Sequence, residues 1–129
     1  MADVSQKLLN KPTYSAAGTN NSTAFKTNGY IDITFILACE APGGVAGDTL
    51  DVVIEESDEQ DFSDAERVRE VLSFTQIIGT HTAASDLKQR KDLPTKNIDT
   101  WVRAKVTTAS DHTKYNGKFF VSMLATEKV

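Results

Sequence analysis

The feature that most constrains this chain is an alternation of apolar and polar residues with a period of two, which recurs in five segments. Successive side chains of a β-strand point to opposite faces, so this period predicts strands with one buried face. In the first segment Ile33 and Phe35 share the apolar face, whereas Thr34 points away from it. The five predicted strands cover residues 30–38, 49–56, 71–78, 100–108 and 118–124.

Turn-forming residues separate these runs, and Asn116-Gly117 is the strongest hairpin signal among them. A capping-box pattern at residues 63–66 could start a helix, but the apolar residues that follow do not sustain one beyond about two turns. We therefore expect a turn there that leads into a strand. About seven or eight short strands at this spacing predict an all-β fold, either an antiparallel β-sandwich or a jelly roll.

The length of the chain favours a single domain. At 129 residues it is long enough for one hydrophobic core and too short for two ordinary domains. Residues 1–22 are rich in small polar residues, and their one apolar pair is Leu8-Leu9. We interpret residues 1–22 as an extended N-terminal arm that contacts a neighbouring subunit through Leu8 and Leu9. Residues 23–129 are then the single β-sandwich domain.

Composition and charge limit the classes of partner. The net charge is −4, whereas proteins that bind nucleic acid usually carry a basic patch. No stretch approaches the roughly 18 apolar residues of a membrane span, and the N-terminus has no apolar run of signal-peptide length. The single cysteine, Cys39, cannot close an internal disulfide. We expect no nucleic-acid partner, no membrane partner, and synthesis in a cytoplasm.

Charge is unevenly divided along the sequence. Residues 1–66 hold 3 basic and 12 acidic side chains and residues 67–129 hold 11 and 6, which gives net charges of −9 and +5. A fold that kept these signs on different faces would let copies attract one another or dock on a charged partner. A fold that interleaves the halves would mix the charges, and this is the arrangement we favour.

The sequence shows no catalytic constellation. Its two histidines, His81 and His112, both lie in turn-like sequence, and no serine stands in a GxSxG motif. Glycine-rich phosphate-binding loops are absent, and one cysteine with two distant histidines does not make a convincing zinc ligand set. We therefore predict no enzyme activity, no catalytic residues and no cofactor.

Seven carboxylates are concentrated in residues 55–66. A calcium-binding EF-hand loop starting at Asp58 would need an oxygen ligand at its fifth position, where Phe62 stands, and a glycine at its sixth, which is missing. A looser calcium site formed by Asp58, Asp61 and Asp64 is one alternative. The other alternative, which we favour, is a solvated corner between strands in which Asp61 and Asp64 cap backbone amides. We therefore predict no metal site.

Trp101 and Arg103 share one face of the predicted strand over residues 100–108. Tryptophan and arginine are enriched where proteins contact one another, so both are candidate partner-contact residues. Packing of Trp101 in the core is the alternative.

Three short motifs point to a family. Residues 50–58 read LDVVIEESD, residues 61–65 read DFSDA, and residues 101–104 read WVRA. The sequence resembles the small jelly-roll decoration (cement) proteins of tailed-bacteriophage heads, in which a strand of the form LxVxIExSD runs into an acidic turn with DxFSDA, and a later strand reads YVRAxVT. Trp101 stands where a tyrosine or another aromatic residue is usual. The resemblance spans about residues 45–125.

The resemblance implies a structural virion protein without catalytic activity. Such a protein binds the outside of an assembled phage capsid and stabilises it by bridging subunits of the major capsid protein, as a homo-oligomer, dimer or trimer. The resemblance also implies that the acidic run is a corner between strands. Two alternatives stay open: another β-sandwich of a phage virion, such as a tail or fibre module, and a β-sandwich that binds calcium or carbohydrate.

Overall fold

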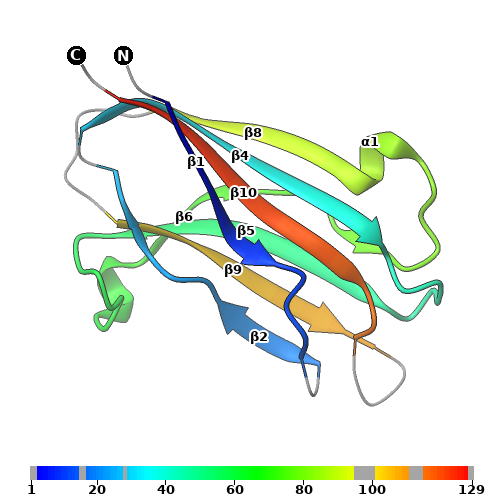
Figure 1. The fold of residues 1–129 in the computed structure, drawn as a ribbon. Helices are drawn as coiled ribbons and strands as arrows, with labels where there is room; N and C mark the ends of the chain where they lie inside the picture. The colour runs from blue at the N-terminus through cyan, green and yellow to red at the C-terminus, as the bar shows by residue number, and fades with distance from the viewer. Residues whose placement is uncertain (1–2, 15–16, 28, 95–100, 111–114, 128–129) are drawn as a thin grey trace.

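The computed structural model describes residues 3–14, 17–27, 29–94, 101–110 and 115–127. These residues form two antiparallel β-sheets that pack face to face (Figure 1). Sheet A has the strand order β1-β10-β4-β8, with bounds β1 (Asp3–Asn10), β10 (Lys118–Glu127), β4 (Tyr30–Ala41) and β8 (Lys88–Pro94). Sheet B has the order β2-β9-β5-β6, with bounds β2 (Gly18–Asn21), β9 (Trp101–Ala109), β5 (Thr49–Ser57) and β6 (Arg69–Ser73). Two short strands complete sheet B: β3 (Phe25–Lys26) pairs with β9, and β7 (Ile77–Ile78) pairs with β5.

The winding of the chain is that of a jelly roll. From β1 through β2, β4, β5, β6, β8 and β9 to β10, the chain occupies the sheets in the order A, B, A, B, B, A, B, A. Two Greek keys wound in this way, four strands to a sheet, define the double-sheet jelly roll. The expected all-β sandwich or jelly roll is confirmed.

This winding interleaves the two halves of the sequence. In sheet A, β1 and β4 come from residues 1–66, and they alternate with β10 and β8 from the second half. In sheet B, β2 and β5 alternate with β9 and β6 in the same way. Strands from the acidic half therefore lie beside strands from the basic half, and the arrangement that mixes the charges is confirmed.

The N-terminal residues belong to the sandwich. Strand β1 pairs with β10 from Asp3, opposite Thr126, to Asn10, opposite Phe120. Leu8 is only 7% exposed and packs in the core, next to a register irregularity between Lys7 and Leu9. Strand β2 pairs with β9. The interpretation of residues 1–22 as an arm outside the core is therefore wrong for the described residues, because an edge strand can be held by backbone pairing and one inward leucine.

The core consists of alternate residues of the four central strands, as the period-two pattern predicts. Each side chain of this set is at most 1% exposed. The set contains Ile33, Phe35 and Leu37 of β4, Leu50, Val52 and Ile54 of β5, Val102, Ala104 and Val106 of β9, and Phe119, Val121 and Met123 of β10. The remaining predicted strand, residues 71–78, is divided between β6 and β7, with Phe74 buried between them.

The prediction of a hairpin at Asn116-Gly117 is wrong. Strand β9 lies in sheet B and β10 lies in sheet A, so the connection between them crosses from one sheet to the other. Gly117 is required there for a different reason: the ring of Tyr115 packs so closely on it that a Cβ atom would overlap the ring.

Helical structure is limited to two short segments among the described residues. The 3-10 helix η1 (Ala65–Arg67) follows the acidic run and leads into β6, which confirms the expected turn into a strand. The helix α1 (Ala84–Leu87) is one turn that precedes β8. Neither helix is long and apolar enough to cross a membrane.

Candidate functional site

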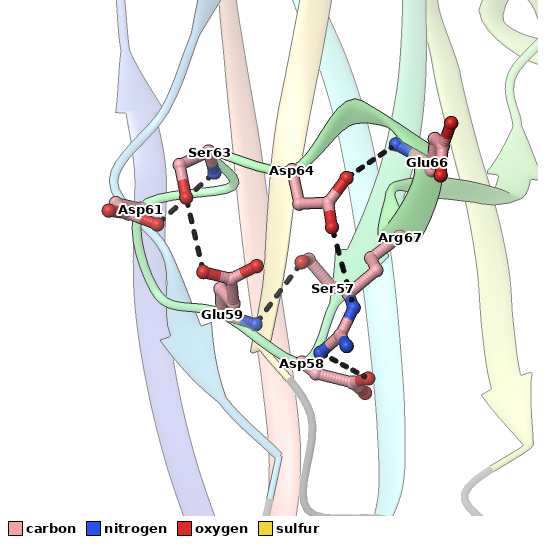
Figure 2. Close-up of polar contacts among 8 residues, drawn as sticks. All are labelled: Ser57, Asp58, Glu59, Asp61, Ser63, Asp64, Glu66 and Arg67. Carbon is pink, nitrogen blue, oxygen red and sulfur yellow. Dashed lines mark hydrogen bonds and ion pairs between the residues drawn. The ribbon is translucent and has the colours of Figure 1, made fainter.

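Residues 58–67, which we call the acidic corner, connect β5 to β6 at one end of sheet B (Figure 2). Two of its carboxylates bind the backbone of the corner itself. Asp61 Oδ1 accepts a hydrogen bond from the Ser63 N–H at 3.1 Å, and Asp64 Oδ1 accepts one from the Glu66 N–H at 3.1 Å. Asp64 thereby caps η1. The prediction that Asp61 and Asp64 cap backbone amides is confirmed.

Further polar contacts close the corner. Ser57, at the end of β5, accepts a hydrogen bond from the Glu59 N–H at 3.1 Å through its Oγ. The Arg67 guanidinium lies 3.5 Å from Asp64 and 4.0 Å from Asp58. These ion pairs are exposed, so each contributes little to stability, but Arg67 offsets part of the local negative charge.

The three aspartates of the alternative calcium site are not brought together. Figure 2 shows Asp61 and Asp58 at opposite ends of the acidic corner, with Asp64 directed toward Arg67. Among the described residues, no group of three acidic, histidine or cysteine side chains is arranged to hold a metal ion.

Phe62 anchors the acidic corner to sheet B. Its side chain is 7% exposed, although most of its neighbours in the corner are exposed. Its ring centroid lies 4.1 Å from Cζ of Arg103 on β9, within the range of a cation–π contact. The backbone of Phe62 has a φ of 54°, in the left-handed region that large side chains rarely adopt. Burial of the ring offsets the cost of this conformation.

Beneath Phe62 lies a nearly buried ion pair. Both Nε and Nη2 of Arg103 approach Oε1 of Glu55 at 3.0 Å, and Lys105 Nζ lies 4.0 Å from Oε2 of the same carboxylate. The side chains of Glu55 and Arg103 are 10% and 19% exposed. Glu55 and Arg103 pair across β5 and β9 on the outer face of sheet B. This end of the face is shielded from water because the acidic corner folds over it.

The predicted partner-contact residues have different environments. Leu8 is buried in the core, so its assignment as an exposed contact is wrong, and Leu9 is half-buried against the core. Arg103 is engaged within the chain by Glu55 and Phe62. Trp101 is half-buried at the start of the central strand β9, outside the core, with Lys26 Nζ 5.8 Å from its ring. For Leu9 and Trp101 a partner contact stays a prediction.

Sequence reasoning missed the role of Phe62. The signal was present, because a large apolar residue surrounded by carboxylates has no reason to be solvated. It also missed the outer face of sheet A, where Leu124 is 39% exposed. The alternation in β10 contained that signal, since Leu124 lies between the buried Met123 and Ala125.

Of the two histidines, only His81 lies in the part of the chain that the structure describes; His112 lies outside it. His81 Nδ1 accepts a hydrogen bond from the Ile78 N–H at 3.1 Å, so this nitrogen closes a turn after β7.

The fold is similar to domains of viral capsid proteins. A subviral particle of VP2 from infectious bursal disease virus matches with a TM-score of 0.57 at 12% identity, over 98% of this chain and 33% of that chain. T=1 particles derived from infectious bursal virus match with a TM-score of 0.55 at 10% identity, over 98% of this chain and 32% of that chain. This chain thus spans about a third of the capsid chains it matches, and at this identity the likeness shows the fold alone. No protein-family model and no curated protein matches the sequence.

Proposed function

We propose that this chain is a structural virion protein that binds the outside of an assembled phage capsid. It stabilises the capsid by bridging subunits of the major capsid protein. Two features support the proposal: the resemblance of residues 45–125 to phage decoration proteins, and a jelly-roll fold of the kind that viral capsid proteins also use.

The observation that carries the proposal is the meeting of the three resemblance motifs in one cluster. Glu55 comes from LDVVIEESD, Phe62 from DFSDA, and Arg103 from WVRA. Arg103 binds Glu55 and lies against Phe62, although the motifs are far apart in the sequence. The motifs therefore describe one three-dimensional unit, as expected if they share a common structural origin with the decoration proteins.

The chemistry of this unit suits a structural role. The polar groups of the acidic corner bind one another and the backbone, so the corner is a closed element that holds β5, η1 and β9 in place. A rigid surface loses little conformational entropy when it binds a partner.

A capsid lattice offers the same binding position many times. A small protein that bridges neighbouring capsid subunits adds buried area at each equivalent position, and an oligomer engages two or more positions at once. Weak single contacts then sum to strong attachment. In this proposal the chain acts as a homo-oligomer, its partner is the major capsid protein, and its location is the outer surface of the virion.

The test uses heads that lack the protein. Purified protein is mixed with such heads, the heads are sedimented, and release of DNA is followed during heating. We expect the protein to sediment with the heads in many copies and to raise the temperature of DNA release. Heads that bind none of the protein and are equally stable with and without it would refute the proposal. Recovery of the protein with purified tails in that case would favour the tail or fibre alternative.

A further inference from the structure

A broad groove crosses the outer face of sheet A. Its volume is about 560 Å³, and its lining includes residues of all four strands, β1, β10, β4 and β8. These strands form the continuous layer that faces away from sheet B in Figure 1. The outer face of sheet B differs, because the acidic corner covers one end of it.

An exposed apolar side chain lies in this groove. Leu124 is 39% exposed, and no other large apolar side chain of the described residues is exposed. On either side of Leu124 along β10, Met123 and Ala125 point into the core. Leu124 therefore points outward, where an isolated sandwich would be expected to place a polar residue.

One row of paired residues crosses the groove. The row contains Ser5 of β1, Leu124 of β10, Thr34 of β4 and Asp92 of β8, which are register partners in that order. It runs at right angles to the strands and divides the groove into two ends. Thr34 donates a hydrogen bond to Asp92 at 2.6 Å, which fixes the β8 end of the row.

Opposite charges stand at equal distances on the two sides of this row. Arg90 of β8 lies two residues before Asp92, opposite Ile36. Asp32 of β4 lies two residues before Thr34, on an antiparallel strand, and therefore on the other side of the row. At about 3.3 Å per residue, Arg90 and Asp32 each stand about 7 Å from the row.

Both charges are available to a partner. Arg90 lies 3.6 Å from Asp92, but the two side chains are 67% and 74% exposed, so this pair is weak and easily exchanged. Asp32 is exposed, and no ion pair among the described residues includes it.

We propose that the outer face of sheet A binds a second copy of this chain in a two-fold symmetric dimer. A two-fold axis along the row through Leu124 exchanges its two sides. Arg90 of one copy then reaches the level of Asp32 of the other, and β4 and β8 are neighbours about 4.8 Å apart, within reach of an arginine side chain. The same operation forms the reciprocal pair and brings the two Leu124 side chains together near the axis.

The outer face of sheet A is large enough, and its strands are suitably oriented, for a dimer interface. With β10 at 10 residues and four strands in the sheet, the face measures about 33 by 19 Å, or about 600 Å² per copy. Two copies contribute about 1,200 Å², the lower end of the range for specific interfaces. The axis also leaves the strands of the two copies nearly aligned, as in the packing of sheets in a sandwich. The dimer deepens the proposed function, because it would give each attached unit two capsid-binding surfaces.

The experiment measures the mass of the isolated protein by sedimentation equilibrium over a range of concentrations. We expect a monomer–dimer equilibrium. Asp32→Arg and Arg90→Asp should each weaken the dimer by about tenfold or more, because each places two like-charged pairs across the axis. An equimolar mixture of the two variants should restore dimerisation, since both pairs again have opposite signs in the mixed dimer. Glu66→Arg is the matched control for Asp32→Arg: it also replaces a negative with a positive side chain, but on the acidic corner, and should leave the dimer unchanged.

A second variant tests the apolar part of the contact. Leu124→Asp should weaken the dimer by about tenfold or more while the melting curve of the monomer stays cooperative, because Leu124 is not in the core. A monomer at all concentrations, a trimer, or single variants whose mixture does not recover would each overturn the proposal. Attachment to heads is measured separately: a monomer that binds heads refutes the dimer alone, and a dimer that binds no heads refutes the proposed function alone.

Discussion

The ring of Phe62 lies 4.1 Å from the guanidinium carbon of Arg103, although 40 residues separate them in the sequence. This contact joins a loop made largely of charged residues to the outer face of a β-sheet. It makes the acidic corner part of the folded structure, because the corner cannot move without exposing Phe62 and the ion pair beneath it. The contribution of this contact to the free energy of unfolding can be measured.

Replacement of Phe62 by alanine should destabilise the protein by about 3 kcal/mol, since it removes a buried aromatic side chain and a cation–π contact. The free energy of unfolding in urea measures this change. Ser63→Ala is the control: it alters an exposed hydrogen bond of the same corner and should cost less than about 0.5 kcal/mol. Equal losses in the two variants would mean that Phe62 does not anchor the corner.

From the ion pair beneath Phe62 we make a second prediction, about the stability of variants of Arg103 and Glu55. Arg103→Met should cost about 3 kcal/mol, because it leaves the Glu55 carboxylate, 10% exposed, without its closest partner. Adding Glu55→Leu should recover most of that loss, since the pair is then replaced by apolar side chains of similar size. A double-mutant cycle measured by urea unfolding checks this. A double variant no more stable than Arg103→Met alone would contradict the expectation.

Calcium should have no saturable effect on stability. Asp61 and Asp64 already accept backbone hydrogen bonds, and the guanidinium of Arg67 lies within 4.0 Å of both Asp58 and Asp64. The melting temperature, followed during titration with calcium up to millimolar concentrations, should change no more than that of the variant in which all three aspartates are asparagine. Stabilisation by several degrees that this variant loses would establish a site.

The strands and the core could be predicted where both the strand and its partner carry the period-two pattern. Phe35, Val52, Val106 and Val121 are examples: each is at most 1% exposed, and each lies on a central strand flanked by two neighbours. Such strands need an apolar inner face along their whole length, so the alternation is complete and visible.

The edge strands β1 and β8 could not be predicted in this way. Strand β8 pairs on one side only, and its charged side chains, among them Lys88 and Arg90, protect the free edge from further pairing. Strand β1 contributes Leu8 to the core, but its sequence, DVSQKLLN, does not alternate apolar and polar residues. For both strands the backbone pairing with β4 or β10 decides the structure, and that pairing leaves little trace in the sequence.

In the candidate site, too, contacts between residues close in the sequence could be predicted, whereas contacts between distant segments could not. The capping roles of Asp61 and Asp64 depend on residues two positions away, so local sequence was sufficient to predict them. The pairing of Glu55 with Arg103 depends on the register between β5 and β9, and the burial of Phe62 depends on a left-handed backbone conformation. Residue types can suggest that Phe62 is buried, but they identify neither the partner of Glu55 nor the surface on which Phe62 packs.

The position of Leu8 in the core predicts the effect of changes in β1. Leu8→Ala should destabilise the protein by about 2 to 3 kcal/mol, because it leaves a cavity in the core. Leu9→Ala, on the neighbouring half-buried residue, should cost clearly less. Deletion of residues 1–10 should abolish the cooperative thermal transition or lower its midpoint strongly, since it removes an edge of sheet A. A deletion variant that melts like the full chain would restore the interpretation of these residues as an arm.

The last prediction concerns alkaline pH. Tyr115 is 5% exposed, and this burial raises the pKa of its phenol above the ordinary value of 10.0, with Cys39 and Asp48 nearby adding to the effect. The neutral phenol is thus favoured by folding. Its contribution to stability is complete below pH 10 and is lost as the pH rises above 10, because the unfolded chain then releases the proton first. Each pH unit above 10 should cost about 1.4 kcal/mol.

The measurement for Tyr115 compares the wild type with Tyr115→Phe, whose side chain cannot ionise. The free energy of unfolding is determined for both proteins between pH 8 and about 11.5. Lysines and the other tyrosines titrate in both proteins, so their effects cancel in the difference between the two curves. We expect this difference to be constant below pH 10 and to shift in favour of the variant above it. Curves that stay parallel through pH 11.5 would show that folding does not raise the pKa of this phenol.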